Sequence, residues 1–219
     1  MIEWCVWDAE QTLYKSTPAL DAEVHRRQYE IVAEYMNIDF DTAKGMFDAE
    51  RVKQPGATAT FVALGIGRNG AQEALDLVDK KRYLSKDKRL GDTFKELKAY
   101  KHAIVTNASR KALYGLFDIV ELDPDIFDVI ITADDVKSYK PQREPFLKFL
   151  KKARTKPKLC VSIGNNDGTD IVPAKSLGMK TILVWGKSKI ADYSSPTVYD
   201  VPLYVKKIAG SNPYDKNRN

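Results

Sequence analysis

Short apolar runs that end in polar, turn-forming residues recur along the chain. They lie at residues 2–7, 103–105, 129–131, 159–163 and 181–184, with a weaker run at 203–205. Continuous rather than alternating apolar runs are typical of strands in a parallel sheet that is covered on both faces. The pattern therefore predicts a strand at each of these positions.

Helical patterns separate the runs, at residues 92–97, 143–154 and 167–177. Asp92 is an N-cap candidate for the first, and Gly178 is a stop signal for the third. The second carries its apolar residues on one face: Phe146, Leu147, Phe149 and Leu150. Alternation of strands and helices predicts an α/β fold with a doubly wound, mostly parallel sheet of the Rossmann-like type.

Residues 15–90 interrupt this rhythm with three helical patterns, at 21–36, 41–51 and 71–81, joined by a glycine-rich link. We interpret this segment as a helical insertion after the first strand. The expected organisation is an α/β core domain of residues 1–14 and 91–209, a helical domain of residues 15–90, and a flexible tail at 210–219.

The net charge of +5 is concentrated in one segment. Residues 137–158 hold nine basic residues and one acid, a local charge of +8, which leaves the rest of the chain at −3. Four of these basic residues lie opposite or beside the apolar face of the 143–154 helix, as expected for a solvated surface: Lys148, Lys151, Lys152 and Arg154. No aromatic ladder or DNA-binding motif accompanies them, so we do not expect nucleic acid as a partner.

Composition excludes several other classes of protein. The 43% of hydrophobic residues is too many for a disordered chain. The longest uncharged stretch, residues 54–67, is shorter than the ~18–20 apolar residues that a membrane span requires, so no membrane association is expected. Glu3 and Asp8 interrupt any signal-peptide pattern, and we expect a cytoplasmic protein.

Cysteine and histidine are scarce, which limits the chemistry further. Cys5 and Cys160 both lie in predicted buried strands, so a disulfide framework and a cysteine zinc site are excluded. His25 and His102 are the only histidines, and each is expected to be a surface or packing residue.

Residues 65–70 fit the pattern G-x-G-x-x-G, which can indicate a dinucleotide site. Such a site needs a second strand that ends in an acid about 20 residues further on. Residues 82–88 do not have the pattern of a strand. We therefore predict that the glycines form a turn within the helical insertion.

Polar groups follow four of the predicted strands. Their carboxyl ends meet at one edge of a doubly wound sheet, where ligands bind at the topological switch point. We therefore expect one site that gathers two carboxylates, a hydroxyl and amide pair, a lysine, and an acid and amide cluster. The residues are Asp8 and Glu10, Thr106 and Asn107, Lys140, and Asn165, Asp167 and Asp170.

In this order and at these distances the motifs resemble those of the haloacid dehalogenase-like hydrolases. That family has D-x-D-x-T after the first strand, a Ser or Thr after the second, a Lys before a helix, and an acidic motif after the fourth. Here they correspond to Asp8 through Thr12, Thr106, Lys140-Pro141, and Gly164 through Asp170. The resemblance covers residues 1–15 and 90–190, and it makes the helical insertion similar to the family's cap.

The resemblance implies a role for each residue. Asp8 is the expected nucleophile, which forms an aspartyl-phosphate, and Glu10 is the expected general acid and base. Thr106, Asn107 and Lys140 are expected to hold the phosphoryl group, with Lys140 balancing the charge between that group and Asp8. The expected Mg²⁺ ligands are Asp8, the backbone carbonyl of Glu10, Asn165 and Asp170.

Two positions depart from the family pattern. Glu10 stands where an Asp is usual, so its carboxylate is displaced by one methylene. General acid and base help of ~10²–10⁴-fold depends on that reach. Asn165 also replaces an Asp, which removes one negative charge near the metal and predicts weaker Mg²⁺ binding. Asp167 is open to two interpretations, an additional acid near the metal or a loop or helix-capping residue.

The favoured function is a Mg²⁺-dependent phosphatase that acts on a small phosphorylated metabolite. Three alternatives stay open: a catalytically impaired relative that binds a phosphorylated ligand or a protein, a phosphomutase, and a dehalogenase on the same scaffold. Cap residues of this family differ freely, so the sequence leaves the substrate open, as it does the oligomeric state.

Overall fold

The structure is a computed structural model and describes residues 2–210. The chain divides into two compact units. One, the α/β unit, comprises the residues up to Lys15 and from Lys86 onward, and the other, the helical unit, is Ser16–Ser85. The expected tail at 210–219 lies outside the described residues except for Gly210.

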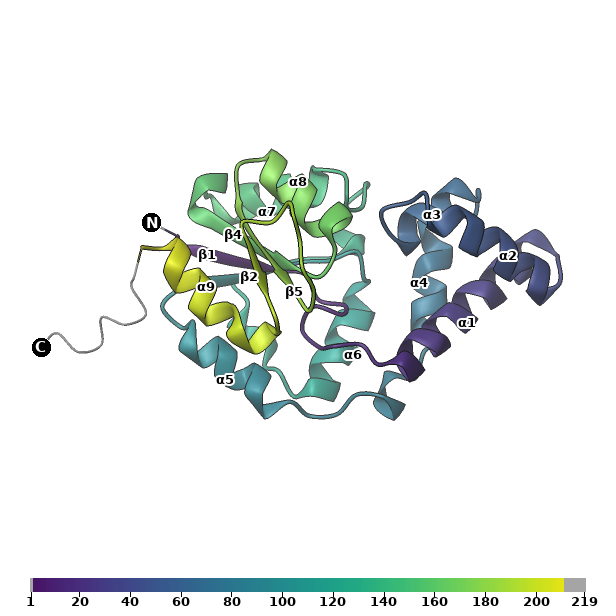
Figure 1. Ribbon diagram of the computed structural model, residues 1–219, viewed down its shortest axis with the longest axis horizontal. Coiled ribbons are helices and arrows are strands. Elements are labelled where there is room, and N and C mark those ends of the chain that lie inside the picture. The colour runs from purple at the N-terminus through teal and green to yellow at the C-terminus, as the bar shows by residue number, and fades with distance from the viewer. Residues whose placement is uncertain (1, 211–219) are drawn as a thin grey trace, which may run out of the picture. The chain divides into compact units, whose positions relative to one another are not determined.

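The α/β unit contains a six-stranded sheet in the order β3-β2-β1-β4-β5-β6 (Figure 1). Each neighbouring pair is parallel, so the predicted α/β fold with a doubly wound sheet is confirmed. The strands are β1 (Trp4–Trp7), β2 (Lys101–Val105), β3 (Val129–Ile131), β4 (Cys160–Gly164), β5 (Lys180–Val184) and β6 (Tyr193–Ser195). The helices of this unit are α5 (Lys88–Glu96), α6 (Arg110–Val120), α7 (Glu144–Ala153), α8 (Val172–Ser176) and α9 (Val201–Ile208).

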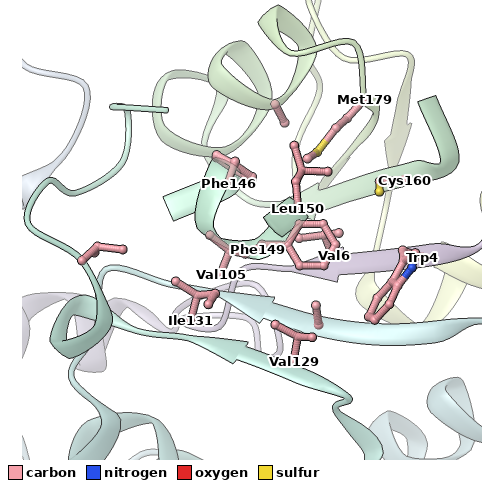
Figure 2. Close-up of a cluster of buried hydrophobic side chains, with 13 residues drawn as sticks. Trp4, Val6, Val105, Val129, Ile131, Phe146, Phe149, Leu150, Cys160 and Met179 are labelled. Atoms are coloured by element: carbon pink, nitrogen blue, oxygen red, sulfur yellow. The ribbon is translucent and has the colours of Figure 1, made fainter. Parts of the chain in front are cut away.

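Residues of β1 alternate between the two faces of the sheet. Trp4 and Val6 contact a cluster that contains Phe146, Phe149 and Leu150 of α7 (Figure 2). Trp7, on the opposite face, packs against Phe94 of α5 with ring centroids 4.9 Å apart. Figure 1 shows α5 and α9 on the side of the sheet opposite α7 and α8. Both faces are therefore covered, which explains the continuous apolar runs.

One of the strands predicted for this unit is wrong. The apolar run at 203–205 lies in α9 and not in a strand. Val201 and Val205 are buried four residues apart while Leu203 is 38% exposed, which is a helical pattern. The sixth strand is instead β6, whose sequence Tyr-Ser-Ser carries almost no apolar signal.

Asp92 is not the N-cap of α5, because the helix begins one turn earlier. Asp87 caps it and accepts hydrogen bonds from the amides of Arg89 and Leu90.

On α7, Leu147 is 49% exposed and does not belong to the buried face. Lys148, Lys151 and Lys152 are exposed, as the sequence predicted.

The helical unit contains α1 (Pro18–Met36), α2 (Phe40–Arg51), α3 (Ala57–Ala63) and α4 (Arg68–Asp76). Thr17 caps α1 and Asp39 caps α2, each through a side-chain oxygen that accepts a backbone amide. A separate hydrophobic core joins the four helices and includes Tyr29, Val32, Phe47, Phe61 and Ala74.

The glycine-rich segment forms a turn between α3 and α4, as predicted. Gly65 and Gly67 have φ of 79° and 85°, the left-handed region that glycine adopts without strain. Phe61 lies in α3, so no strand precedes the glycines and the geometry of a dinucleotide site is absent from this segment. No helix within residues 2–210 is both long enough and apolar enough to cross a membrane.

Candidate active site

The candidate site begins where β1, β2 and β4 end side by side. In the register of the sheet, Trp7 lies opposite Ile104 of β2 and Ile163 of β4. The amide of Asp8 continues the ladder by donating to the carbonyl of Ile163 at 2.9 Å. β1 is also the strand at which the order of the sheet reverses, so these strand ends form its topological switch point.

Lys140 lies between two carboxylates at this edge. Its Nζ is 2.7 Å from Asp8 Oδ1 and 2.7 Å from Asp170 Oδ1. Relative exposure is 2% for Lys140, 2% for Asp170 and 9% for Asp8, so water screens these charges weakly. Residues that are far apart in the sequence thus form one buried cluster with two negative charges and one positive charge.

Burial and charge act against each other in this cluster. Burial alone would lower the pKa of Lys140, but the carboxylates of Asp170 and Asp8 outweigh it and raise that pKa. Burial raises the pKa of Asp170, although Lys140 acts in the opposite direction. One ammonium does not compensate two desolvated carboxylates.

The backbone around Lys140 is fixed by Asn107, which follows β2. Lys140 N donates to Asn107 Oδ1 at 2.8 Å, and Asn107 Nδ2 donates to Lys140 O at 2.9 Å. Glu144, at the start of α7, accepts the amides of Lys137 and Ser138 in the same loop. The Asn107 side chain therefore positions the lysine, while its predicted contact with phosphate stays a prediction.

Thr12 connects Asp8 with Asn165. Its Oγ1 lies 2.9 Å from Asp8 Oδ2 and 3.2 Å from Asn165 Oδ1. The carbonyl of Thr12 accepts the indole N–H of Trp185, which follows β5. Because Lys140 and Thr12 each hold one oxygen of Asp8, that carboxylate has a fixed orientation.

The Glu10 side chain forms a hydrogen bond with a residue for which the sequence predicted no role. Tyr14 donates its hydroxyl to Glu10 Oε2 at 2.6 Å. Burial raises the pKa of the Tyr14 hydroxyl well above its usual value of 10.0, and Glu10 adds to the effect. Ala9 O accepts the amides of Thr12 and Leu13, so this segment turns like a helix. In such a turn, side chains four residues apart lie next to each other. The spacing of Glu10 and Tyr14 was therefore the signal in the sequence that could have predicted their contact.

The loop after β4 places Asp170 beside Lys140. Asn166 N donates to Asp170 Oδ2 at 3.0 Å, and the Asn166 side chain accepts the amides of Gly168 and Thr169. An added Cβ at Gly164 would lie 2.4 Å from Asp170 Cβ, so only glycine allows this close approach. Asp167 does not cap the following helix and instead accepts the Ser188 hydroxyl at 2.6 Å.

Thr106 follows β2 and is buried with 2% exposure. Its hydroxyl accepts the amide of Ala108 at 3.1 Å, which fixes the turn that leads into α6. The structure gives neither histidine a contact with the predicted site residues of its own unit. His25 is exposed, and His102 is buried beside Trp7 and Phe94.

The donor set fits a hard divalent cation. Asp8 and Asp170 supply carboxylates, Asn165 supplies an amide oxygen, and the excess negative charge around Lys140 favours a cation. Within residues 2–210, no cluster of three or more His, Cys, Asp or Glu side chains has the arrangement of a metal site. Beside these two carboxylates, amide, backbone or water oxygens would have to supply the other ligands of a cation.

The strands form a doubly wound α/β sheet with a buried aspartate at its switch point, and comparison with known proteins gives the family. The family model described as haloacid dehalogenase-like hydrolase matches residues 72–184, more than half of the chain. The chain belongs to this family, as its motifs indicated. The matched segment contains Thr106, Lys140, Asn165 and Asp170 but not Asp8 or Glu10.

Among curated proteins, pyrophosphatase PpaX of Bacillus mycoides is 36% identical over 115 residues, which are 50% of this chain and 53% of that protein. The chain therefore spans about half the length of the curated relatives that it matches. A HAD phosphatase from Thermococcus onnurineus has a TM-score of 0.65 at 22% identity, covering 96% of this chain and 99% of that one.

The L-2-haloacid dehalogenase from Xanthobacter autotrophicus has a TM-score of 0.59 at 18% identity, covering 94% of this chain and 99% of the other. A phosphatase and a dehalogenase thus share this fold, which by itself does not select a reaction.

Proposed function

We propose that this protein is a Mg²⁺-dependent phosphatase that hydrolyses a small phosphorylated metabolite through an aspartyl-phosphate on Asp8. The observation that carries the proposal is the buried Asp8–Lys140–Asp170 cluster at the switch point. Similarity to a pyrophosphatase supports phosphate chemistry, so esters and anhydrides of phosphate are both proposed substrates. The helical unit is proposed as the cap domain, and the cytoplasmic location stays a prediction.

In the proposed reaction, a carboxylate oxygen of Asp8 attacks phosphorus while the bond to the leaving oxygen breaks. Glu10 gives a proton to that oxygen. Water then attacks phosphorus, Glu10 takes a proton from the water, and cleavage of the acyl phosphate releases inorganic phosphate and restores Asp8.

The other proposed roles are electrostatic. Lys140 keeps Asp8 oriented and balances the charge of the phosphoryl group, and Thr106 and Asn107 bind its oxygens. A bound Mg²⁺, held by Asp8, the Glu10 carbonyl, Asn165 and Asp170, would neutralise charge that develops on the phosphoryl oxygens.

Hydrolysis of p-nitrophenyl phosphate and of inorganic pyrophosphate, each with and without Mg²⁺, tests the proposal. We expect Mg²⁺-dependent release of phosphate that Asp8→Asn abolishes. Asp92→Asn, the same change at an exposed position of α5, is the matched control and should keep full activity. Metal-independent activity that survives in Asp8→Asn would overturn the proposal.

The Glu10–Tyr14 hydrogen bond favours one second candidate, a catalytically impaired protein that binds a phosphorylated ligand. In this second candidate the Tyr14 hydroxyl keeps the Glu10 carboxylate away from a leaving group, whereas in the phosphatase it positions that carboxylate. The double variant Glu10→Asp/Asn165→Asp distinguishes the candidates. A large gain over an inactive parent would support impairment, and unchanged activity of an active parent would exclude it.

A further inference from the structure

A cavity lies in the α/β unit, away from the candidate active site. Its volume is about 780 Å³, within the range of small-molecule pockets. Its walls come from α5, from the segment that leads into β2, and from the residues that follow α6. Lys101 and His102, at the amino end of β2, belong to the lining. Thr106 follows the opposite end of the strand, about 13 Å away at ~3.3 Å per residue.

The floor of this cavity, which we call the α5 pocket, is apolar. Phe94, Val120 and Leu122 are buried there, and Ile126 is partly buried. Gly91 opens the wall, because an added Cβ at this residue would meet no atom within 4 Å. The space above α5 is thus left free by a glycine in the middle of a helix, a residue that costs ~1 kcal/mol of helix stability relative to alanine.

The acidic residues of the lining are already engaged within the protein. Glu121 forms a salt bridge with Lys86, and Asp128 accepts the amide of His102 at 3.1 Å. The remaining two, Asp87 and Asp123, accept backbone amides as helix caps. These carboxylates are therefore poor partners for a bound cation.

Two lysines of the lining are also paired, Lys86 with Glu121 and Lys95 with Asp92, but in the described part of the chain the others are not. Within residues 2–210, neither Lys98 nor Lys101 forms a salt bridge, and Lys101 instead lies over the ring of Trp4 at 5.4 Å. Lys88 is exposed at the start of α5. Ammonium groups at the rim and apolar side chains on the floor match a ligand with an anionic group and an apolar body.

We propose that the α5 pocket is a binding site for a small anionic molecule with an aromatic or aliphatic body. The site is separate from the phosphate chemistry, because its lining contains none of the predicted catalytic, phosphate-binding or metal residues. The anionic group contacts Lys98 and Lys101, and the apolar body lies on Phe94, Leu122 and Ile126. This inference does not depend on the proposed phosphatase activity.

Titration with 8-anilinonaphthalene-1-sulfonate, an anionic aromatic fluorophore, tests the proposal on the full chain. We expect saturable binding at one site and weaker binding of the neutral analogue N-phenyl-1-naphthylamine. Gly91→Trp places an indole in the pocket and should lower the affinity at least about tenfold. Gly91→Ala, which adds one methyl group, should bind almost as the parent does.

Two controls separate the pocket from general effects. Gly115→Trp introduces the same side chain at a glycine of α6 that is also surrounded by open space and lies outside the pocket, and it should not change the affinity. Lys98→Glu should weaken the anion about fivefold and the neutral analogue little, whereas Lys151→Glu on α7 should affect neither. Circular dichroism of each variant verifies the fold.

Absence of saturable binding to the parent would overturn the proposal. It would also be overturned if a folded Gly91→Trp bound the anion as the parent does, or if Lys98→Glu weakened the neutral and the anionic probe equally. Competition by inorganic phosphate that persists in Gly91→Trp would assign the probe to the phosphate site instead. Loss of phosphatase activity on its own has no bearing on these outcomes.

Discussion

Replacement of Lys140 by methionine removes the ammonium that Asp8 and Asp170 share and keeps an unbranched side chain of similar length. At an effective dielectric constant of ~20, each 2.7 Å contact contributes about 6 kcal/mol of attraction. Desolvation of the three charges costs several kcal/mol each and offsets most of that gain. Without the Lys140 ammonium, the two carboxylates stay desolvated but lose the attraction. Removing one partner of a buried ion pair typically costs about 3–5 kcal/mol of stability.

Thermal and urea unfolding at neutral pH, followed by circular dichroism, measure this cost. A chain of this size loses roughly 2–4 °C of Tm per kcal/mol, so Lys140→Met should lower Tm by about 6–20 °C. Lys151→Met, at an exposed position on α7, is the matched control and should change the stability by less than about 0.5 kcal/mol.

A second substitution tests the cause of the loss. Lys140→Met/Asp170→Asn removes one of the two uncompensated charges and should recover at least about half of the lost stability, because the remaining pair no longer repels. The reasoning is refuted if Lys140→Met costs less than about 1 kcal/mol, or if the double variant is less stable than the single one.

Three further changes have defined outcomes. Gly164→Ala places a Cβ against Asp170 and should lower the free energy of unfolding in urea by about 1–3 kcal/mol. It should also remove most of the activity. A variant with unchanged stability and activity would contradict the close approach of Gly164 to Asp170. Tyr14→Phe removes the 2.6 Å hydrogen bond to Glu10 and should lower kcat about fivefold at nearly constant KM, whereas a changed KM alone would exclude a positioning role. Burial lowers the pKa of His102 from 6.5, so the unfolded chain binds the proton more readily. The stabilisation from neutral His102 is present above pH 6.5 and is lost as the pH falls below it. His102→Gln should therefore flatten the dependence of the unfolding free energy on pH below 6.5. An identical pH dependence in the variant would disprove the contribution of His102.

The sequence predicted the sheet well because parallel strands that are buried on both faces leave an unambiguous apolar signal. The prediction failed where a helix has the same apolar signal as a strand, and where a strand has no apolar signal. The run at 203–205 is equally apolar in a helix, and Pro202 at the start of α9 is compatible with that helix. β6 consists of one tyrosine and two serines, so its pairing with β5 depends on the tertiary context.

The candidate site was predictable at the level of strand ends and not at the level of contacts. Sheet topology brings Asp8, Lys140 and Asp170 to one edge, and motif order identifies them. The amide clamp from Asn107 to the backbone of Lys140 requires knowledge of the loop conformation, which spacing does not encode. The same holds for the contact between Tyr14 and Glu10, since a helix-like turn after β1 has to be assumed first.

The charge balance of the site links these observations to the proposed chemistry. Two buried carboxylates and one ammonium leave a single net negative charge, which would repel a phosphate dianion. A divalent cation reverses the sign, so phosphate binding and cation binding should favour each other. Asn165 matters in this balance, because an aspartate there would add another negative charge and leave the loaded site close to neutral. An asparagine would thus weaken the binding of a cation, and the site with the cation bound would be more positive toward phosphate.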